Sequence, residues 1–292
     1  MSIHDPNIDI DWLTSDFSPI SLDELNETAE MLSRIDNKYV VPRVALQRLV
    51  PALRHEFNIL DIDQRRAFTY DTRYFDDAQR SAYFEHHQGL RKGFKVRVRR
   101  YADAGLSFLE VKVKGKRGMT EKYRLQHDAG LVEHLSDDAM RFAKDTYFGQ
   151  YGKPFDYKLQ AALDIRYKRI TLVAKNGGER MTIDTDLRFR TDNGTMSLGT
   201  DVFIVEAKSA LGRGYADIEL RRAHQRPTRK CSKYCIGMAA MGEVKRYNRF
   251  LPTMRKLGLI DAAGTRGGWS DIRPDLRLNV ADRDIARSRS AA

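Results

Sequence analysis

The sequence of 292 residues lacks the features that define membrane, secreted and zinc-binding proteins. It contains no run of about 18 apolar residues, which excludes a transmembrane helix, and its start lacks the basic and then apolar pattern of a signal sequence. It has only two cysteines, Cys231 and Cys235, with no histidine or further cysteine near enough to suggest zinc, so we interpret both as free thiols. These absences predict a soluble, cytoplasmic protein.

Acidic residues are unevenly distributed, and most of the chain is strongly basic. The net charge is +11, yet residues 1–33 hold eight acids and no lysine or arginine. The remainder therefore carries 51 basic and 32 acidic residues. A body this basic attracts phosphate-rich partners over long range, and charge alone favours nucleic acid.

Residues 93–124 contain three short stretches that alternate with a period of two, which is typical of strands with two distinct faces. The turns between them lie at 103–105 and 115–118, so the segment is predicted to be an antiparallel meander. One face of each strand is apolar and the other is basic. The basic face carries Lys95, Arg97 and Arg99, then Glu110, Lys112 and Lys114, then Lys122 and Arg124.

The simplest interpretation of this face is a sheet with its charges in water, which suits any one of the strands. Three consecutive basic strands weaken that interpretation. Like charges on one face lie roughly 7 Å apart along a strand, and each contact costs about 2.4 kcal/mol at an effective dielectric constant of about 20. Because Glu110 is the only acid on the face, we expect a polyanion to neutralise it.

The rest of the chain alternates between helical and strand periodicity. Residues 21–24 form a capping box that opens a helix to about residue 33, and Asp76 with Asp77 caps a helix that ends at Gly89. Further strands are predicted at 34–41, 65–75, 157–174, 180–190 and 201–208, and further helices at 43–55, 130–148, 215–225 and 232–241. About eight strands with one charged face each predict an α+β fold, an antiparallel eight-stranded β-barrel with helices packed outside.

No internal repeat or composition shift marks a domain boundary within the chain. Residues 1–20 are acidic and aperiodic, which predicts a mobile N-terminal arm. Residues 21–250 are expected to form a single domain. Residues 251–292 are expected to form a polar, poorly ordered tail.

The sequence leaves open whether the charged faces of the barrel point inward or outward. If they point inward, the interior suits a chain of phosphates; if outward, the same residues form a basic plate for RNA or DNA. Helices packed outside a barrel also require an apolar outer face, so the positions of the apolar residues do not decide between the two orientations. The residues concerned are Lys38, Arg97, Arg99, Lys112, Lys122 and Arg124, with the acids Glu110 and Glu206.

Eight short motifs occur in order within residues 25–245. They are Arg34-x-Asp36-x-Lys38-Tyr39, Tyr74-Phe75-Asp76, Arg97-x-Arg99 followed by Tyr101, Glu110-x-Lys112, Lys122 after a Gly-rich turn, Tyr167-x-Arg169, Val205-Glu206-x-Lys208 and Ser232-Lys233-Tyr234. Together they resemble the polyphosphate-polymerase (VTC) branch of the triphosphate tunnel metalloenzymes. The wider superfamily begins with Glu-x-Glu-x-Lys, whereas Arg34 and Asp36 occupy the two Glu positions here. This departure suits the polymerase branch and disfavours a CYTH-type hydrolase or cyclase.

The resemblance implies an antiparallel tunnel whose basic interior binds ATP and inorganic polyphosphate or triphosphate, together with Mn²⁺ or Mg²⁺. It implies that Glu206 is a metal ligand and Glu110 a second acid, for the metal or for orienting Lys112. Arg124 belongs to the same interior. The implied phosphate ligands are Lys38, Arg97, Arg99, Lys112, Lys122, Arg169 and Lys233, and the implied catalytic residues are Arg97, Arg99, Lys112, Lys122, Arg169 and Glu206.

The implied reaction is polyphosphate synthesis from ATP. It needs no general base, which fits a sequence with no evident Ser/His/Asp or Cys/His constellation. A triphosphatase and a non-catalytic polyphosphate-binding module are the alternatives. Nucleic-acid binding ranks last, because no recognised motif for it is present.

Several of these residues also have plainer interpretations. Lys38 and Glu206 can form a salt bridge across the sheet, and Arg169 can lie on the surface. Lys233 at a helix start can be solvated, and Tyr74 can serve only in core packing. The sequence gives no oligomeric state.

Overall fold

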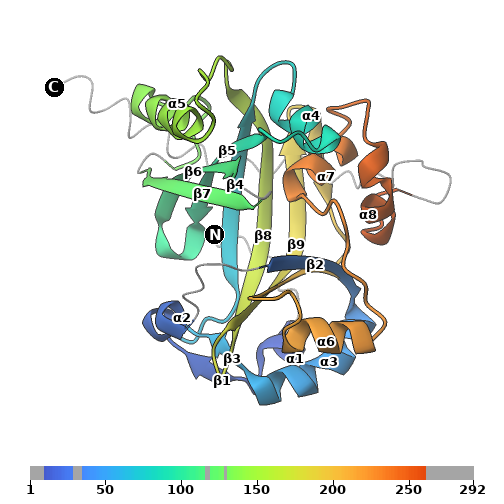
Figure 1. Ribbon diagram of the computed structural model, residues 1–292. Coiled ribbons are helices and arrows are strands. Elements are labelled where there is room, and N and C mark those ends of the chain that lie inside the picture. Colours follow the sequence, from blue (N-terminus) through green and yellow to red (C-terminus); the bar gives the residue numbers. More distant parts are fainter. Residues whose placement is uncertain (1–9, 29–34, 116–118, 128–129, 261–292) are drawn as a thin grey trace, which may run out of the picture.

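The protein is described here by a computed structural model, which covers residues 10–28, 35–115, 119–127 and 130–260 (Figure 1). Its centre is one large sheet in which each strand pairs with its neighbours in antiparallel fashion. Across the sheet, the order is β2 (Ile35–Pro42), β11 (Val202–Ser209), β9 (Glu179–Thr191), β8 (Gln160–Ala174), β4 (Phe68–Asp76), β5 (Phe94–Tyr101), β6 (Leu106–Lys114) and β7 (Thr120–Gln126).

Three short strands extend this sheet at its margins. β3 (Phe57–Leu60) pairs with β8, and β1 (Ser18–Ile20) pairs with β3 in parallel. β10 (Gly194–Ser197) folds back on the end of β9. None of the three was predicted, because each is too short to show a period.

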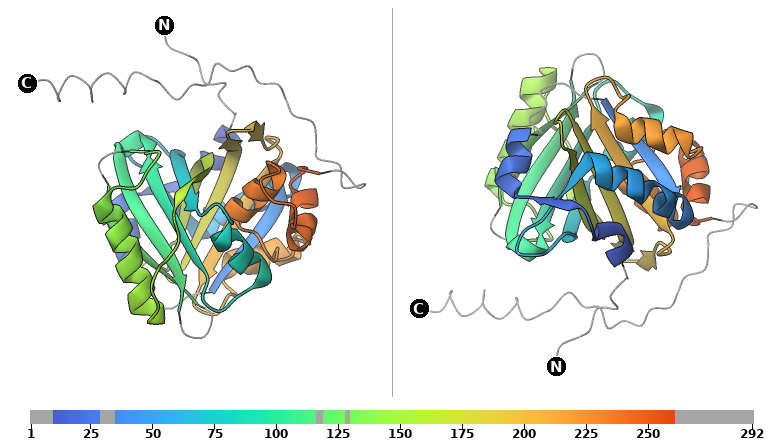
Figure 2. Two further views of the ribbon diagram at one scale, coloured as in Figure 1. Left: turned by 90° about the horizontal axis from the view of Figure 1, so that it is seen from above. Right: turned by 90° about the horizontal axis from the view of Figure 1, so that it is seen from below.

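The predicted α+β fold and its eight main antiparallel strands are confirmed, with one small difference. The strand order begins at β2 and ends at β7, and the described residues of these two strands do not pair with each other. The sheet is therefore strongly curved but not closed, as Figure 2 shows from both ends. We call the side that carries Tyr74 and Glu206 the inner face.

The outer face of the sheet is covered by helices in two places, because the strands turn their apolar residues outward. Tyr39 and Val205 contribute to one core with α1 (Asp11–Thr14), α3 (Arg43–Glu56) and α6 (Tyr215–Arg222). Val96 and Val111 contribute to another core with α5 (Asp137–Tyr151). These groups of helices lie at opposite ends of the molecule (Figure 1).

The remaining helices modify the prediction that helices pack only outside. α7 (Lys233–Ala240) packs against the inner face, where the ring of Tyr234 stacks on Tyr74 with 4.9 Å between centroids. α4 (Ser81–Gln88) packs beside it, and its first turn is capped by Asp76 and Asp77 as predicted. α8 (Leu251–Lys256) contacts α7 in turn. One end of the inner face is thus closed by helices.

The predicted termini need correction where the structure describes them. Of the expected mobile arm, residues 10–20 include α1 and β1, and Leu13 and Phe17 are buried in the core. Of the expected tail, residues 251–260 include α8, and Met254 and Ile260 are buried. Both predictions rested on the average composition of a longer segment, which obscured the apolar residues within it. Residues 1–9 and 261–292 lie outside the described residues.

The start of α2 (Leu22–Thr28) has the predicted capping box. Ser21 Oγ accepts a hydrogen bond from Glu24 N at 3.2 Å, and Ser21 N donates to Glu24 Oε2 at 3.0 Å.

Within residues 10–28, 35–115, 119–127 and 130–260, no helix is both long and apolar enough to cross a membrane.

Candidate functional site

Three lysines lie side by side on the inner face of β5, β6 and β7. The strand register pairs Lys95 with Lys112 and Lys112 with Lys122. Opposed residues of antiparallel strands point to the same side of a sheet, so the three ammonium groups form one row. We call it the lysine row. The row confirms that each lysine lies on the basic face predicted from the alternation of residues along its strand.

The middle lysine of this row forms no ion pair within the described part of the chain. Lys95 donates to Ser232 Oγ at 3.0 Å, and Lys122 Nζ lies 3.5 Å from Glu110 Oε1. Lys112 makes no hydrogen bond or ion pair with any residue that the structure describes. The charge of nearby Arg97, followed by burial, holds the pKa of Lys112 well below its usual range. The positive charges of Arg97 and Arg99 are therefore concentrated around Lys112, whose ammonium pairs with none of the described carboxylates.

A buried carboxylate, Glu110, organises the arginines beside the lysine row. The register places it between Arg97 and Arg124, and its side chain is almost fully buried. Arg97 Nε donates to Glu110 Oε2 at 2.7 Å, and Arg99 lies 3.9 Å from the same oxygen. Burial alone would raise the pKa of Glu110, but Arg97, Arg99 and Lys122 hold it well below the usual range. The carboxylate stays ionised and fixes the two guanidinium groups.

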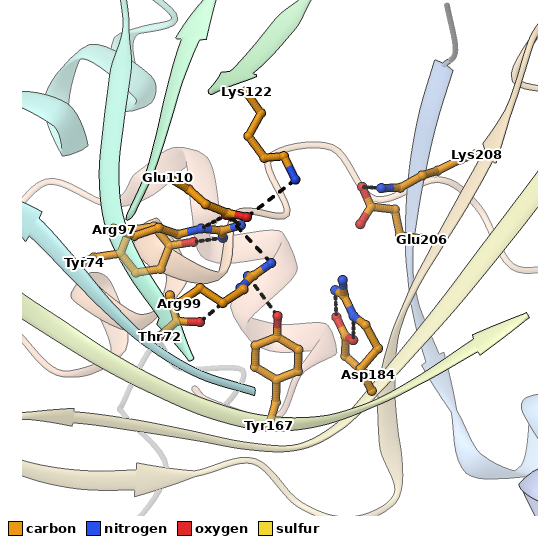
Figure 3. A network of polar contacts seen from close by, with 11 residues as sticks. Thr72, Tyr74, Arg97, Arg99, Glu110, Lys122, Tyr167, Asp184, Glu206 and Lys208 are labelled. Atoms are coloured by element: carbon orange, nitrogen blue, oxygen red, sulfur yellow. Dashed lines mark hydrogen bonds and ion pairs between the residues drawn. The ribbon is translucent and has the colours of Figure 1, made fainter. Parts of the chain in front are cut away.

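Neutral side chains complete the positioning of these two arginines (Figure 3). Arg97 NH1 donates to the phenol oxygen of Tyr74 at 2.7 Å. Arg99 NH2 donates to the phenol oxygen of Tyr167 at 3.0 Å, and its Nε lies 3.4 Å from Thr72 Oγ1. Held guanidinium groups lose less conformational entropy when they bind an anion.

A second buried carboxylate, Asp184 on β9, holds a further pair of cations on the other side of the inner face. Arg169 binds both oxygens of Asp184, at 2.6 and 2.8 Å, and Lys233 Nζ donates to Oδ2 at 2.5 Å. The side chains of Arg169 and Lys233 are only 13% and 17% exposed. Neither is the solvated surface residue that the plainer interpretation of the sequence allowed.

The ion pairs of Asp184 make stability depend on pH in the acid range. Burial would raise its pKa, but Arg169 and Lys233 lower it to about 2 from an ordinary value of 3.8. The stabilising contribution of this carboxylate is therefore present above about pH 4 and is lost as the pH falls toward 2. We expect Asp184→Asn to lower the free energy of unfolding at pH 7 by about 2 kcal/mol.

The measurement is urea unfolding of the parent and Asp184→Asn at pH 7 and at pH 3. The difference between the two proteins should shrink at pH 3. An equal difference at both pH values would show that Asp184 does not act through its charge.

A third group of charges surrounds Glu206 on β11. Lys38 of β2 donates to Glu206 Oε1 at 2.5 Å, which is the salt bridge across the sheet that the plainer interpretation of these residues allowed. Lys208 Nζ lies 3.7 Å from the same oxygen and 3.9 Å from Asp36 Oδ2. Burial would raise the pKa of Glu206, but Lys38 and Lys208 hold it well below the usual range. Glu206 and Asp36 are the two acids of the inner face that share one cation.

The carboxylates of the inner face are the candidate ligands for the predicted metal site. Among the described residues, no group of three or more His, Cys, Asp or Glu is placed to hold a metal. Mg²⁺ and Mn²⁺, however, are commonly held by one or two carboxylates, with water and substrate phosphates as the other ligands. Asp36 and Glu206 fit that pattern. Glu110 does not, because cations contact both of its oxygens, so its surroundings favour ion pairing over the predicted metal role.

The sequence places this charged face in a known family. The VTC domain matches residues 33–242, which is most of the chain. The chain belongs to the VTC domain family. The resemblance seen in the short motifs is therefore confirmed over nearly the full range on which those motifs lie. No curated protein matches the chain in sequence.

Solved structures similar to this VTC domain share little sequence with it. One is a candidate adenylate cyclase from Bacillus halodurans, with 13% identity and a TM-score of 0.44, over 69% of this chain and 95% of that one. Another is a candidate adenylyl cyclase from Hippeastrum with a dominant triphosphatase activity, with 14% identity and a TM-score of 0.43, over 70% of this chain and 95% of that one.

The VTC domain brings most of the predicted site residues onto one face. Arg97, Arg99, Arg169 and Lys233 are largely buried there, and Lys112 is half-buried. Lys122 is 44% exposed and still reaches Glu110. Arg124 is exposed and lies over the ring of Phe108, at 5.1 Å from the centroid, so it stands at the margin of the site. Arg34 lies outside the described residues.

Sequence reasoning missed several residues of the VTC domain site. Asp184 was predicted within a strand, but the face of that strand was not assigned; the alternation of Thr182 and Asp184 could have revealed it. Lys208 was named in the Val205-Glu206-x-Lys208 motif but was not predicted to belong to the site. Tyr74, expected in core packing, does pack against Tyr234 but also binds Arg97. Both cysteines are free thiols, as expected, and both are buried.

Proposed function

We propose that this protein transfers the terminal phosphate of ATP to the end of an inorganic polyphosphate chain bound along the inner face. The observation that carries the proposal is Lys112, a cation that lies between Lys95 and Lys122 without a counter-ion among the described residues. A row of lysines is unfavourable until a polyanion lies across it. Phosphates linked in a chain supply charges along such a row in a way that an isolated anion does not.

The chain's own residues match what phosphoryl transfer requires. The reaction demands positioning and charge neutralisation rather than covalent catalysis by the protein. Arg97 and Arg99 present guanidinium groups that are already oriented, and such groups bind phosphate oxygens through two parallel hydrogen bonds. Lys112 and Lys122 add mobile charges that follow the phosphate as negative charge moves during the transfer.

Atoms and charges balance without a general base. A terminal oxygen of polyphosphate, already anionic at pH 7, forms the new bond to the γ-phosphorus of ATP. The bond from that phosphorus to the bridging oxygen of the β-phosphate breaks, and ADP leaves with the electron pair. Asp36 and Glu206 would hold a divalent cation, which would supply charge neutralisation at phosphate oxygens.

The test is incubation of the purified protein with ATP and either Mn²⁺ or Mg²⁺, with polymer followed on a gel and orthophosphate measured in the same samples. Long polymer, formed with ADP in equal amount to the phosphate incorporated, is the expected result. Orthophosphate without polymer would replace the proposal with a triphosphatase. Tight binding of polyphosphate without turnover would replace it with a binding module.

The same preparation tests the weakest alternative, nucleic-acid binding. Affinities for polyphosphate and for single-stranded and duplex DNA or RNA are compared at equal salt. Binding to nucleic acid depends steeply on salt. A higher affinity for nucleic acid than for polyphosphate would contradict the proposal.

A further inference from the structure

The ammonium group of Lys208 lies between two carboxylates on the inner face. Its Nζ is 3.7 Å from Glu206 Oε1 and 3.9 Å from Asp36 Oδ2. Lys208 pairs with Asp36 in the register of β2 and β11, and Glu206 is two residues earlier on the same face. In Figure 3, the side chain of Lys208 points to the Glu206 carboxylate. The ammonium therefore stands where a cation shared by the two acids would stand.

A hydroxyl group with no partner lies next to this pair of acids. Thr182 on β9 is directly opposite Glu206 in the register of β9 and β11, so its side chain points to the same face. Thr182 is 1% exposed, and its Oγ1 has no hydrogen-bond partner in the described part of the chain. A buried hydroxyl without a partner is unfavourable, because it has lost its hydrogen bonds to water. The cost suggests that Oγ1 acquires a partner in a bound state.

We propose that Asp36, Glu206 and Thr182 form one cation site, for which the ammonium of Lys208 and a divalent cation compete. The inference rests on the proposed function only for the identity of the cation, Mn²⁺ or Mg²⁺. Oxygen ligands from two carboxylates and one hydroxyl suit both ions, whose remaining ligands are water or phosphate oxygens. Lys38 stays on Glu206 Oε1.

Competition of this kind makes the substrate-free protein a weak metal binder. Lys208 neutralises the two acids and repels a second cation, so an ion that enters the site must displace the ammonium. The displaced Lys208 then joins the cations that can contact phosphate. Metal binding and phosphate binding thus favour each other through a single side chain.

The inference is tested by titration of the substrate-free protein with Mn²⁺, with free Mn²⁺ followed by electron paramagnetic resonance at fixed pH and ionic strength. Lys208→Met keeps the length of the side chain and removes its charge. It is expected to bind Mn²⁺ at least tenfold more tightly than the parent. Lys233→Met, which removes a charge from the Asp184 cluster, is the matched control and is expected to change the affinity less than threefold.

A second substitution assigns the hydroxyl ligand. In the Lys208→Met background, Thr182→Val is expected to weaken Mn²⁺ binding at least threefold, and Asp36→Asn at least tenfold. The inference is wrong if Lys208→Met binds Mn²⁺ no more tightly than the parent. Lys208→Gln serves the same purpose if the Met variant does not fold. Because no ATP is present, a catalytically inactive protein gives the same answer, so failure of the proposed function is distinguishable.

Discussion

Replacement of Glu110 by Gln is expected to lower the free energy of unfolding by about 3–5 kcal/mol in phosphate-free buffer. Glu110 is almost fully buried and contacts three cations through its two oxygens. An amide keeps the shape but removes the charge that balances Arg97 and Arg99. Two guanidinium groups that are less than a tenth exposed would then repel each other without a counter-ion. Urea unfolding at pH 7 measures the loss.

A surface carboxylate provides the matched control for this prediction. Asp201 is 79% exposed and lies 4.0 Å from Arg43. Asp201→Asn should therefore change stability by less than about 1 kcal/mol. Glu110→Gln should also be stabilised more by added tripolyphosphate than the parent is, because a bound phosphate replaces the missing charge and tighter binding stabilises the folded state more.

The same variant separates the two roles considered for Glu110. A counter-ion role predicts a large loss of stability in the absence of metal. A metal-ligand role predicts nearly unchanged stability without metal and weaker Mn²⁺ binding. Stability equal to that of the parent would contradict the assignment of Glu110 to Arg97 and Arg99.

The meander of β5, β6 and β7 was predictable because it is local. A period of two fixes which residues share a face, and short turns fix the pairing of neighbouring strands. The sequence therefore predicted that Lys112 and Lys122 lie on the same side as Arg97. Whether that side is the inner one depends on β8, β9 and β11, which follow later in the chain and pair by register that periodicity does not encode.

The carboxylates that pair with the cations of the site were harder to predict than the cations themselves. Asp184 holds Arg169 and Lys233, yet Lys233 lies 49 positions from Asp184 along the chain. Lys233 reaches Asp184 because α7 packs on the inner face, which amphipathic patterning does not distinguish from packing outside. The open edge between β2 and β7 was missed for a similar reason, since strand number alone does not determine whether a curved sheet closes.

The missed core residues at the termini have a different cause. Residues 10–20 lie within an acidic segment of the sequence, and residues 251–260 precede a long polar one, so the composition of the longer segments obscured the side chains that these residues bury. Leu13 and Met254 are nevertheless fully buried. Short segments that dock on a completed core depend on a surface that exists only after the rest of the chain has folded.

Lys112→Met is expected to have opposite effects on stability and on function. Removal of a cation without a counter-ion relieves its repulsion with Arg97 and Arg99, so the phosphate-free protein should become more stable by about 1–2 kcal/mol. The loss of one positioned donor to a transferring phosphate should lower the rate of polymer synthesis by about 10²–10³-fold. Urea unfolding and the initial rate of polymer formation measure the two effects.

The pH dependence of stability provides an independent check on the same residue. The pKa of Lys112 is lowered in the folded protein relative to 10.5, so the unfolded chain binds the proton more tightly. Stability therefore rises as the pH increases from the folded pKa toward 10.5, and Lys112→Met should lack this part of the rise. Lys144→Met, on the exposed side of α5, should retain both the rise and the activity. If Lys112→Met is less stable than the parent and synthesises polymer at the parent rate, Lys112 is an ordinary structural residue and the lysine row does not bind the phosphate chain.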